Sequence, residues 1–413
     1  MRNTSIALLL LLAATSARAQ TPAANATNDD QSVAAPDTGA VERILTRVNR
    51  WFGGDETGPA KSGLYPEFNH QITGSGWVSI GPGYHYQFLN GRAFAEGSAS
   101  VSWRGYELAQ GRIELSDLAD HRLSIGSQVM WQDMKQIDYF GIGPASVHAG
   151  RSEYRMRDTD VVGYSVYRPL RWLAVDGTVG WLHQPTLASP SGAFLRGYPS
   201  ALETFSNDPG MDRQPDFLHG GVSVVADTRD HHDYARQGGV YRAAASAYSD
   251  RDYSQYTFRR YELEGLQYVP VVPNRVTLAF HGWGVFSDTS NGNSVPFYLL
   301  PALGGNDTLR GYIDYRFNDR NLLLASGEAR VHVHRFIDVA GFFDAGNVAA
   351  KAGDLDLNKT SWGGGVRLHA ATSTLGRFDI GHSAEGWRYV FRMNDPFRLA
   401  RLLRRTATTP FVP

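Results

Sequence analysis

The sequence predicts an all-β fold: a transmembrane antiparallel β-barrel of about 16 strands, with a lumenal loop between two of them. Three observations predict it. The chain begins with an export signal, it is rich in glycine and aromatic residues (44 Gly, 20 Tyr, 20 Phe and 9 Trp), and apolar and polar residues alternate along most of it. Such alternation gives membrane barrels a modest mean hydropathy, here −0.32. A secreted β-sandwich or propeller is the soluble alternative.

Residues 1–19 form a predicted secretory signal peptide. Arg2 supplies a positive charge, an apolar run follows, and Ala17-Arg18-Ala19 is a small-x-small cleavage site. The apolar run is too short to span a bilayer as a helix, and no other stretch of the sequence approaches the necessary length. Residues 20–40 are mainly Ala, Thr, Asn, Asp, Pro and Gln, which predicts a disordered tail.

Residues 41–53 form a predicted short amphipathic helix that ends at Gly53-Gly54. Its apolar residues fall at helical spacing, with arginines between them: Val41, Ile44, Leu45, Val48 and Phe52. Two interpretations stay open. The helix could pack on the mouth of the barrel, or it could lie in the membrane interface with its basic face outward.

Residues 75–397 form the predicted barrel, because there the apolar pattern changes to a period of two. In one clear run Leu123, Ile125 and Val129 share a face. The sequence contains about 15 such runs, and the even strand numbers of bacterial barrels favour 16. The link at residues 271–274 predicts a tight periplasmic turn, and the longer link at residues 185–216 predicts an external loop.

Charged residues fall on one face of two successive predicted strands. These residues are Glu328, Arg330, His332 and His334 in the first strand, and Asp338 and Asp344, together with Phe342, in the second. An arginine or lysine that faces lipid at the membrane midplane costs ~2–4 kcal/mol. This face is therefore predicted to line the lumen, where the charges can pair with each other or with an inserted segment.

The composition excludes several classes of function. The chain has no cysteine, so thiol catalysis and cysteine-ligated metals are excluded, and a net charge of −1 does not favour nucleic acid. No motif selects a catalytic triad, although some outer-membrane barrels are lipases or proteases. We therefore predict a non-enzymatic protein without a cofactor.

No metal site is predicted either. His231-His232 lies beside Asp230 and Asp233 on a predicted turn, where adjacent residues rarely converge on one ion. His332 and His334 share a face, but the sequence offers them no clear third ligand.

The motif Leu309-Arg310-Gly311-Tyr312 is the most informative feature of the sequence. It lies in a long segment between two predicted strands, residues 295–321. A loop of this length in a compact domain is usually functional or disordered, and this one has too many aromatic and apolar residues for disorder. The motif is therefore a candidate functional site.

The motif also carries a family resemblance. The stretch around it, followed by GEARVHVHR and GFFDAGNV, resembles the barrel of the BamA/TamA superfamily, the bacterial surface antigen family. The resemblance extends to three further stretches, residues 139–144, 227–230 with Gly238-Gly239, and 376–380. Each is weak alone, and their order and spacing make the resemblance specific over about three quarters of the chain.

The resemblance implies that the long loop folds into the lumen and that its arginine meets an acidic residue of the wall. In this sequence Arg310 would reach Asp344, with Glu328 nearby. The chemistry agrees, because the guanidinium is permanently charged and its planar fork suits a carboxylate. Gly311 would allow close approach of the backbone, and Tyr312 would pack with its hydroxyl bonded.

Two departures from the family pattern stand out. Only about 55 residues separate Gln20 from Ser75, near the ~50-residue lower limit for a domain, so a periplasmic substrate-binding domain is not expected. Trp387, Tyr389 and Phe391 alternate outward and Phe397 is the nominal strand end, yet residues 398–413 follow as a basic extension. That extension could bind anionic headgroups or hang free in the periplasm.

The resemblance implies an integral barrel of the bacterial outer membrane that assists insertion or translocation of proteins or lipids. Its partners would be outer-membrane lipid, nascent outer-membrane proteins or a separately encoded periplasmic module. A passive diffusion pore, or a membrane anchor for a partner protein, is the alternative function.

Overall fold

The computed structural model describes residues 62–69, 79–192, 195–232, 234–290, 292–370, 374–392 and 397. The predicted signal peptide, disordered tail, amphipathic helix and basic extension lie outside the described residues. Within them, no helix is both long and apolar enough to cross a membrane.

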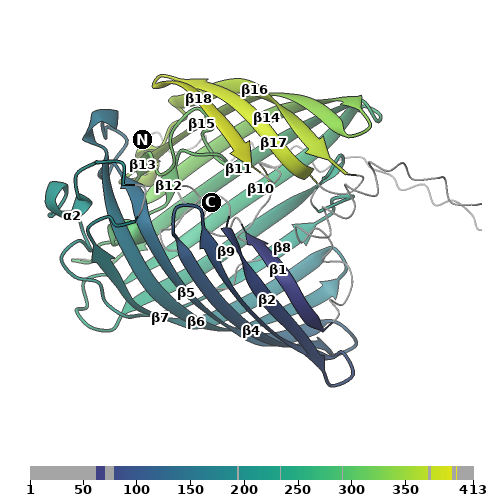
Figure 1. The fold of residues 1–413 in the computed structure, drawn as a ribbon, viewed down its shortest axis with the longest axis horizontal. Coiled ribbons are helices and arrows are strands. Elements are labelled where there is room, and N and C mark those ends of the chain that lie inside the picture. Colours follow the sequence, from purple (N-terminus) through teal and green to yellow (C-terminus); the bar gives the residue numbers. More distant parts are fainter. Residues whose placement is uncertain are drawn as a thin grey trace, which may run out of the picture.

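The described chain forms one 16-stranded antiparallel sheet that curls into a barrel (Figure 1), and the predicted fold and strand number are confirmed. The strands of the wall are β1(Gly63–Asn69), β2(Ser79–Phe88), β3(Ala93–Ser102), β4(Glu107–Leu118), β5(Leu123–Tyr139), β6(Ser152–Leu170), β7(Leu173–Ala188), β8(Phe217–Asp227), β9(Gly238–Asp250), β10(Phe258–Val272), β11(Val276–Thr289), β14(Asn321–His334), β15(Ile337–Ala349), β16(Lys359–His369), β17(Thr374–Ser383) and β18(Gly386–Arg392).

The remaining elements are short and lie in the connections. They are η1(His148–Gly150), α2(Ala201–Thr204), η2(Phe297–Leu299), β12(Ala302–Leu303), β13(Phe317–Asn318) and η3(Ala352–Asp354). Each strand of the wall pairs with its neighbour in sequence, except that β11 pairs with β14 across the segment that contains β12 and β13.

The barrel starts at Gly63 rather than at the predicted Ser75. Strand β1 escaped the sequence pattern because it is short and contains Pro66, a residue that strands tolerate mainly at sheet edges. Pro66 lies directly opposite Pro82 of β2 in the ladder. Strand β1 is indeed an edge: among the described residues no ladder joins it to β18. We call the boundary between β1 and β18 the seam.

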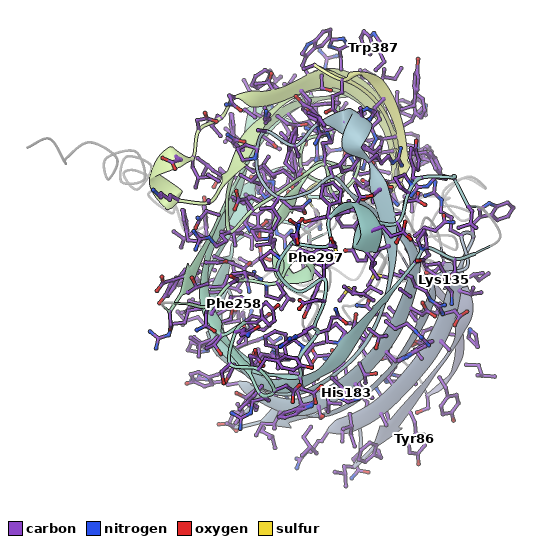
Figure 2. The ribbon with its side chains drawn as sticks, turned by 90° about the vertical axis from the view of Figure 1, so that its left-hand side faces the viewer. Tyr86, Lys135, His183, Phe258, Phe297 and Trp387 are labelled. Carbon is purple, nitrogen blue, oxygen red and sulfur yellow. The ribbon has the colours of Figure 1, made fainter. Side chains whose placement is uncertain are left out.

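The wall is apolar outside and polar inside, the reverse of a soluble barrel. Along β10, Leu263 is 54% exposed while its neighbours Glu262 and Glu264 are buried. In Figure 2 Phe297 lies inside the ring of strands, whereas Tyr86 and Trp387 point outward. An apolar outer face surrounding a charged interior is the arrangement that a lipid bilayer requires.

The predicted lumenal face of β14 and β15 is buried along most of its length, although His334, at the end of β14, is exposed. Glu328, Arg330, Asp338 and Asp344 are each no more than 3% exposed. Residues of opposite parity face outward, since Val331, Val333, Val339 and Phe343 are all more than 40% exposed. The alternation of the sequence was therefore sufficient to sort these side chains between lumen and lipid.

The connections at the two ends of the barrel differ in length. At one end the turns are short, such as residues 273–275 between β10 and β11, where Arg275 N donates to Val272 O at 2.9 Å. The predicted tight turn is thus confirmed. The other end carries long connections, including residues 189–216 and 290–320. One short-end connection is longer than the rest, residues 228–237 between β8 and β9.

Candidate functional site

The connection between β11 and β14, residues 290–320, folds into the lumen, and we call it the lumenal loop. Its two short strands, β12 and β13, pair with each other through Ala302 with Asn318 and Leu303 with Phe317. This small hairpin encloses the motif, and all four motif residues are buried, with Leu309, Arg310 and Tyr312 at 3% exposure or less. The candidate site therefore lies inside the barrel, not on a surface loop.

Arg310 meets the predicted carboxylates. Its Nη2 lies 2.7 Å from Asp344 Oδ1 and its Nε lies 3.0 Å from Asp344 Oδ2, a bidentate fork. Its backbone N–H also donates to Asp344 Oδ2 at 3.1 Å, and its Nη1 binds Glu328. The guanidinium carbon stands 3.6 Å from the centre of the Phe342 ring, within cation–π range.

Three wall arginines extend this contact into a network. Arg330 Nε and Arg367 Nη2 lie 2.7 Å and 2.9 Å from the Glu328 carboxylate. Arg367 also binds Asp379, which in turn accepts from Arg377 Nη1 at 2.9 Å. Arg377 Nη2 then reaches Asp307 of the lumenal loop at 2.6 Å.

The members of this arginine network balance in charge: Arg310, Arg330, Arg367 and Arg377 against Asp307, Glu328, Asp344 and Asp379. Buried charges are costly unless they are paired and hydrogen-bonded. Burial alone would lower the pKa of Arg310, but the charges of Asp344 and Glu328 raise it well above its ordinary value. Arg310 therefore keeps its charge and fastens the loop to the carboxylates of the wall.

Gly311 lies against the backbone of β17 and the side chain of Ser361 in β16. A Cβ at this position would stand 2.8 Å from both His382 O and Ser361 Cβ, closer than van der Waals contact allows. Gly311 O accepts from Ser383 Oγ at 2.9 Å. Only glycine therefore lets the loop approach β16 and β17 this closely.

Leu309 and Tyr312 anchor the apolar side of the motif. They pack in one buried cluster with residues of the loop and of β11, β14 and β15: Trp283, Val285, Leu303, Phe317, Leu322, Leu324 and Val348. The Tyr312 carbonyl accepts from Arg388 Nη1 of β18 at 2.5 Å. The motif consequently touches every strand from β14 to β18, the last of which borders the seam.

The beginning of the lumenal loop crosses to the opposite wall. Val295, Phe297, Tyr298, Leu299 and Leu300 are all buried, and they share a cluster with apolar side chains of β4 to β7. Those wall residues include Leu108, Met130, Met134, Tyr154, Met156 and Leu182. The loop therefore spans the lumen from one wall to the other.

The aromatic residues at the end of the last strand agree only in part with the prediction. Trp387, Tyr389 and Phe391 project from β18 and are 59%, 69% and 66% exposed on the outer face. Phe397, predicted as the strand end, instead lies inside, only 3% exposed. Its ring is 5.6 Å from the guanidinium carbons of both Arg310 and Arg330. The strand ends at Arg392, so the alternation that orients Tyr389 no longer applies at Phe397.

Several members of the arginine network could not be found from the sequence. Arg367, Arg377 and Asp379 alternate with apolar or glycine residues in β16 and β17, which marks them as lumenal. Their contacts with Glu328 and Asp307 depend on the register of four strands, and that register is visible only in the structure.

The two histidine pairs noted in the sequence have different surroundings in the structure. His232 is exposed and its Nδ1 lies 3.4 Å from Asp227 Oδ2, in a turn. His334 is also exposed. His332, however, meets Asp338 and His369, and their ligand atoms lie within 4.8 Å of one another. The third ligand that the sequence did not offer comes from β16, two strands away.

Comparison with known proteins agrees with this fold. Residues 197–385 match the Omp85 superfamily domain. BamA from Haemophilus ducreyi lacking POTRA domains 1–3 has a similar structure, with a TM-score of 0.58 at 13% identity, over 86% of this chain and 78% of that one. CdiB from Escherichia coli gives a TM-score of 0.48 at 13% identity, over 85% and 67%. No curated protein matches this chain in sequence.

Proposed function

We propose that this chain is an outer-membrane β-barrel of the Omp85 superfamily, whose domain matches residues 197–385, and that it assists insertion or translocation of proteins or lipids at the outer membrane. Barrels of this superfamily are transporters and insertases rather than enzymes. The observation that carries the proposal is the combination of a lumenal loop docked on β14 to β18 with a seam that lacks a ladder.

The seam supplies the working surface in this proposal. An unpaired strand edge presents free backbone N–H and C=O groups that can template an incoming strand. Within the described residues β1 and β18 share no ladder, and in this proposal their outer edges receive the incoming strand. The docked motif holds β14 to β18 in register beside that edge, and Arg310 and Asp344 act as positioning residues.

The crossing of the lumen by the loop speaks against a passive diffusion pore. Tyr298 and Leu299 are both 0% exposed and pack on the wall opposite the motif. A diffusion pore needs an aqueous channel lined by solvated side chains. This part of the lumen is instead filled with buried, mainly apolar side chains, together with Arg260, which donates to Leu299 O.

The test uses the seam directly. Leu64→Cys in β1 and Tyr389→Cys in β18 are bridged with thiol cross-linkers of graded length, and the native chain contributes no cysteine. The protein is reconstituted in phospholipid vesicles, and folding of a urea-denatured outer-membrane barrel is followed on gels. We expect the uncross-linked protein to accelerate client folding and the bridged protein to lose that acceleration.

Two results would contradict the proposal. One is client folding at the rate of empty vesicles. The other is a steady conductance in planar bilayers that the bridge leaves unchanged, which would favour the pore. Each single-cysteine variant, treated with the same reagent, controls for modification alone.

A further inference from the structure

The connection between β8 and β9, residues 228–237, folds into the short-turn mouth of the barrel. Its Tyr234 is 3% exposed and donates its hydroxyl hydrogen to Asp338 Oδ2 at 2.6 Å. The Tyr234 ring also stacks on His369, with ring centres 4.2 Å apart and planes 14° apart. The tip of this connection therefore rests on side chains of β15 and β16.

Asp338 contacts two histidines at this mouth of the barrel. His332 Nδ1 lies 2.8 Å from Asp338 Oδ1, and His369 Nε2 lies 3.2 Å from the same oxygen. His332 is the direct cross-strand partner of Asp338, and the ladder shifts register just beyond it. A second register shift lies at His369 itself. Such irregularities occur at barrel rims and redirect side chains there.

The orientation of the His369 ring points to a cation at this place. Its Nδ1 lies 2.9 Å from the carbonyl oxygen of Ala370, which can only accept, so Nδ1 carries a proton. In a neutral imidazole the lone pair is then on Nε2, directed at Asp338 Oδ1. A lone pair that faces a carboxylate is stable only when a proton or a metal ion lies between them. A backbone carbonyl on the far nitrogen is also how proteins orient metal-binding histidines.

We propose that His332, Asp338 and His369 bind a divalent transition-metal ion of the zinc class. Two imidazole nitrogens and one carboxylate form a ligand set that Zn²⁺ accepts, with a fourth position left for water or another oxygen. Tetrahedral ligands at Zn²⁺ are about 3.3 Å apart, given bonds of about 2.0–2.1 Å. The 2.8 Å and 3.2 Å separations in this cluster are close to that spacing.

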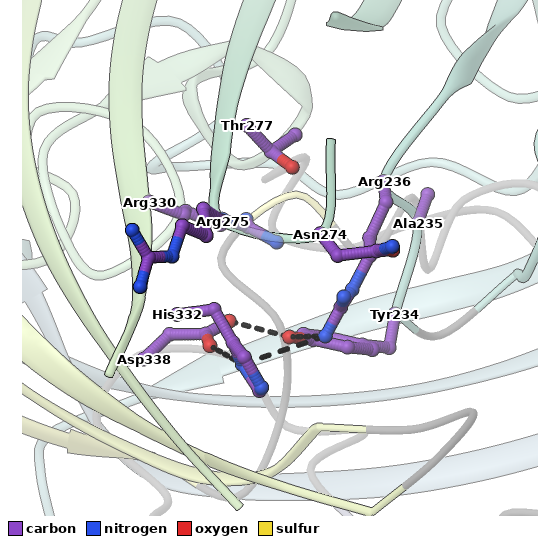
Figure 3. A pocket seen from close by; sticks show the side chains of 9 residues that line it. All are labelled: Tyr234, Ala235, Arg236, Asn274, Arg275, Thr277, Arg330, His332 and Asp338. Carbon is purple, nitrogen blue, oxygen red and sulfur yellow. Dashed lines mark hydrogen bonds and ion pairs between the residues drawn. The ribbon is translucent and has the colours of Figure 1, made fainter. Parts of the chain in front are cut away.

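A small pocket lies beside the cluster (Figure 3). Its walls include Arg236, Arg275 and Thr277 together with His332 and Asp338. Tyr234 Oη, 3.2 Å from His369 Nε2, is the nearest additional oxygen. A bound ion would thus join three strands of the wall to the β8–β9 connection.

The positive charge of Arg236 disfavours a bound cation, and this allows a second, independent test of the proposal. Its Nη2 lies 3.0 Å from Tyr234 Oη and 3.5 Å from His332 Nδ1. A guanidinium so close to a ligand atom repels a divalent cation. Removal of this charge should therefore tighten metal binding, whereas removal of any ligand should weaken it.

The experiment is a Zn²⁺ titration of the protein purified in detergent without a polyhistidine tag, stripped with chelator and held at pH 8. We expect one equivalent to bind by calorimetry, and Co²⁺ to give the visible absorption of a tetrahedral site. His332→Gln, Asp338→Asn and His369→Gln should each weaken binding at least about tenfold, since changing even the outer partners of metal ligands typically costs about 10–100-fold. Arg236→Gln should bind Zn²⁺ more tightly than the parent.

His334→Gln is the matched control, since His334 is exposed on the same strand, and it should bind Zn²⁺ like the parent. If His369→Gln fails to show the gel shift of a folded barrel, the half-buried His332 still decides the question. The proposal is overturned if the parent binds no stoichiometric Zn²⁺, or if His332→Gln binds it as tightly as the parent. Absence of stoichiometric Zn²⁺ binding would mean that a proton, not a metal ion, lies between His369 and Asp338.

Discussion

The lumenal loop touches two walls of the barrel in chemically opposite ways. On β14 to β17 it is held by ions, through Arg310 and Asp307 against buried wall charges. On β4 to β7 it is held by apolar packing, through Val295 to Leu300. Bidentate ion pairs fix distance and angle, whereas apolar contact is non-directional and tolerates adjustment. The ion pairs therefore fix the position and orientation of the loop on β14 to β17, whereas the packing on β4 to β7 allows small adjustments.

The largest effect is expected from breaking the ionic contact on one side only. Asp344→Ala leaves the Arg310 guanidinium buried without its bidentate partner, which typically costs ~3–5 kcal/mol. The temperature at which the folded barrel loses its gel shift should fall, and urea unfolding in detergent gives the free energy. Asp354→Ala removes an exposed carboxylate and should change the free energy of unfolding by less than ~0.5 kcal/mol.

The pairing itself is tested by combining Asp344→Ala with Arg310→Ala. Contacting residues are coupled, so the double variant should lose less stability than the sum of the two single changes. Strict additivity would show that Arg310 and Asp344 do not act as a pair.

Leu299→Ala tests the apolar wall. Leu299 is fully buried, and deletion of such a side chain costs about 2–5 kcal/mol, depending on how far the cavity collapses. The losses of stability from Leu299→Ala and Arg310→Ala should add within ~0.5 kcal/mol, because Leu299 lies in the apolar cluster on one wall and Arg310 in the arginine network on the other. Strong coupling between them would mean that the two walls hold the loop as a single unit. Leu357→Ala, on a 42% exposed residue, is the control.

Gly311→Ala tests the close approach on the ionic side. The added Cβ meets backbone atoms of β17 that cannot turn aside, and overpacking of this kind costs about 1–3 kcal/mol. Gly327→Ala in β14 is the control, because nothing lies within 4 Å of the added Cβ. If both variants unfold at the same urea concentration, the close approach of the loop to β16 and β17 does not contribute to stability.

Ser361→Ala is expected to have the smallest effect. Ser361 Oγ donates to Asp344 Oδ2 at 3.1 Å, and loss of one such bond costs about 1 kcal/mol. Because Asp344 keeps its contacts with Arg310, the loop should stay docked and client folding should be unchanged. Ser165→Ala, on an exposed serine of β6, should leave the urea midpoint where it is. A larger loss from Ser361→Ala than from Asp344→Ala would reverse the ranking.

Periodicity in the sequence predicted the wall well. A period of two assigns each residue to one of two faces, so Glu328 and Asp344 could be assigned to the lumen without any knowledge of their neighbours. Strand β1 was missed because Pro66 and its short length weaken that signal. The strand number followed from counting runs and from the need for an even total.

Contacts between strands were harder to predict. The position of Arg310 opposite Asp344 came from a family resemblance, not from periodicity. Arg377 reaching Asp307, and His369 reaching Asp338, depend on register shifts and on a loop fold that no local pattern encodes. Phe397 turned inward for a similar reason, since its ring has lumenal arginines as neighbours only once the barrel is formed.

The proline pair in the first hairpin makes the two edges of the seam unequal. The ladder between β2 and β3 is interrupted at Gly81 and Pro82, because the Pro82 nitrogen points toward β3 and has no hydrogen to donate. Pro66 lies opposite Pro82, so its nitrogen points the other way, toward the seam. An incoming strand would therefore find one hydrogen-bond donor missing in the middle of β1. The edge of β18, whose seven residues include no proline, offers an uninterrupted series of donors and acceptors. A partner strand that joins both edges would be bound continuously by one and released more easily by the other.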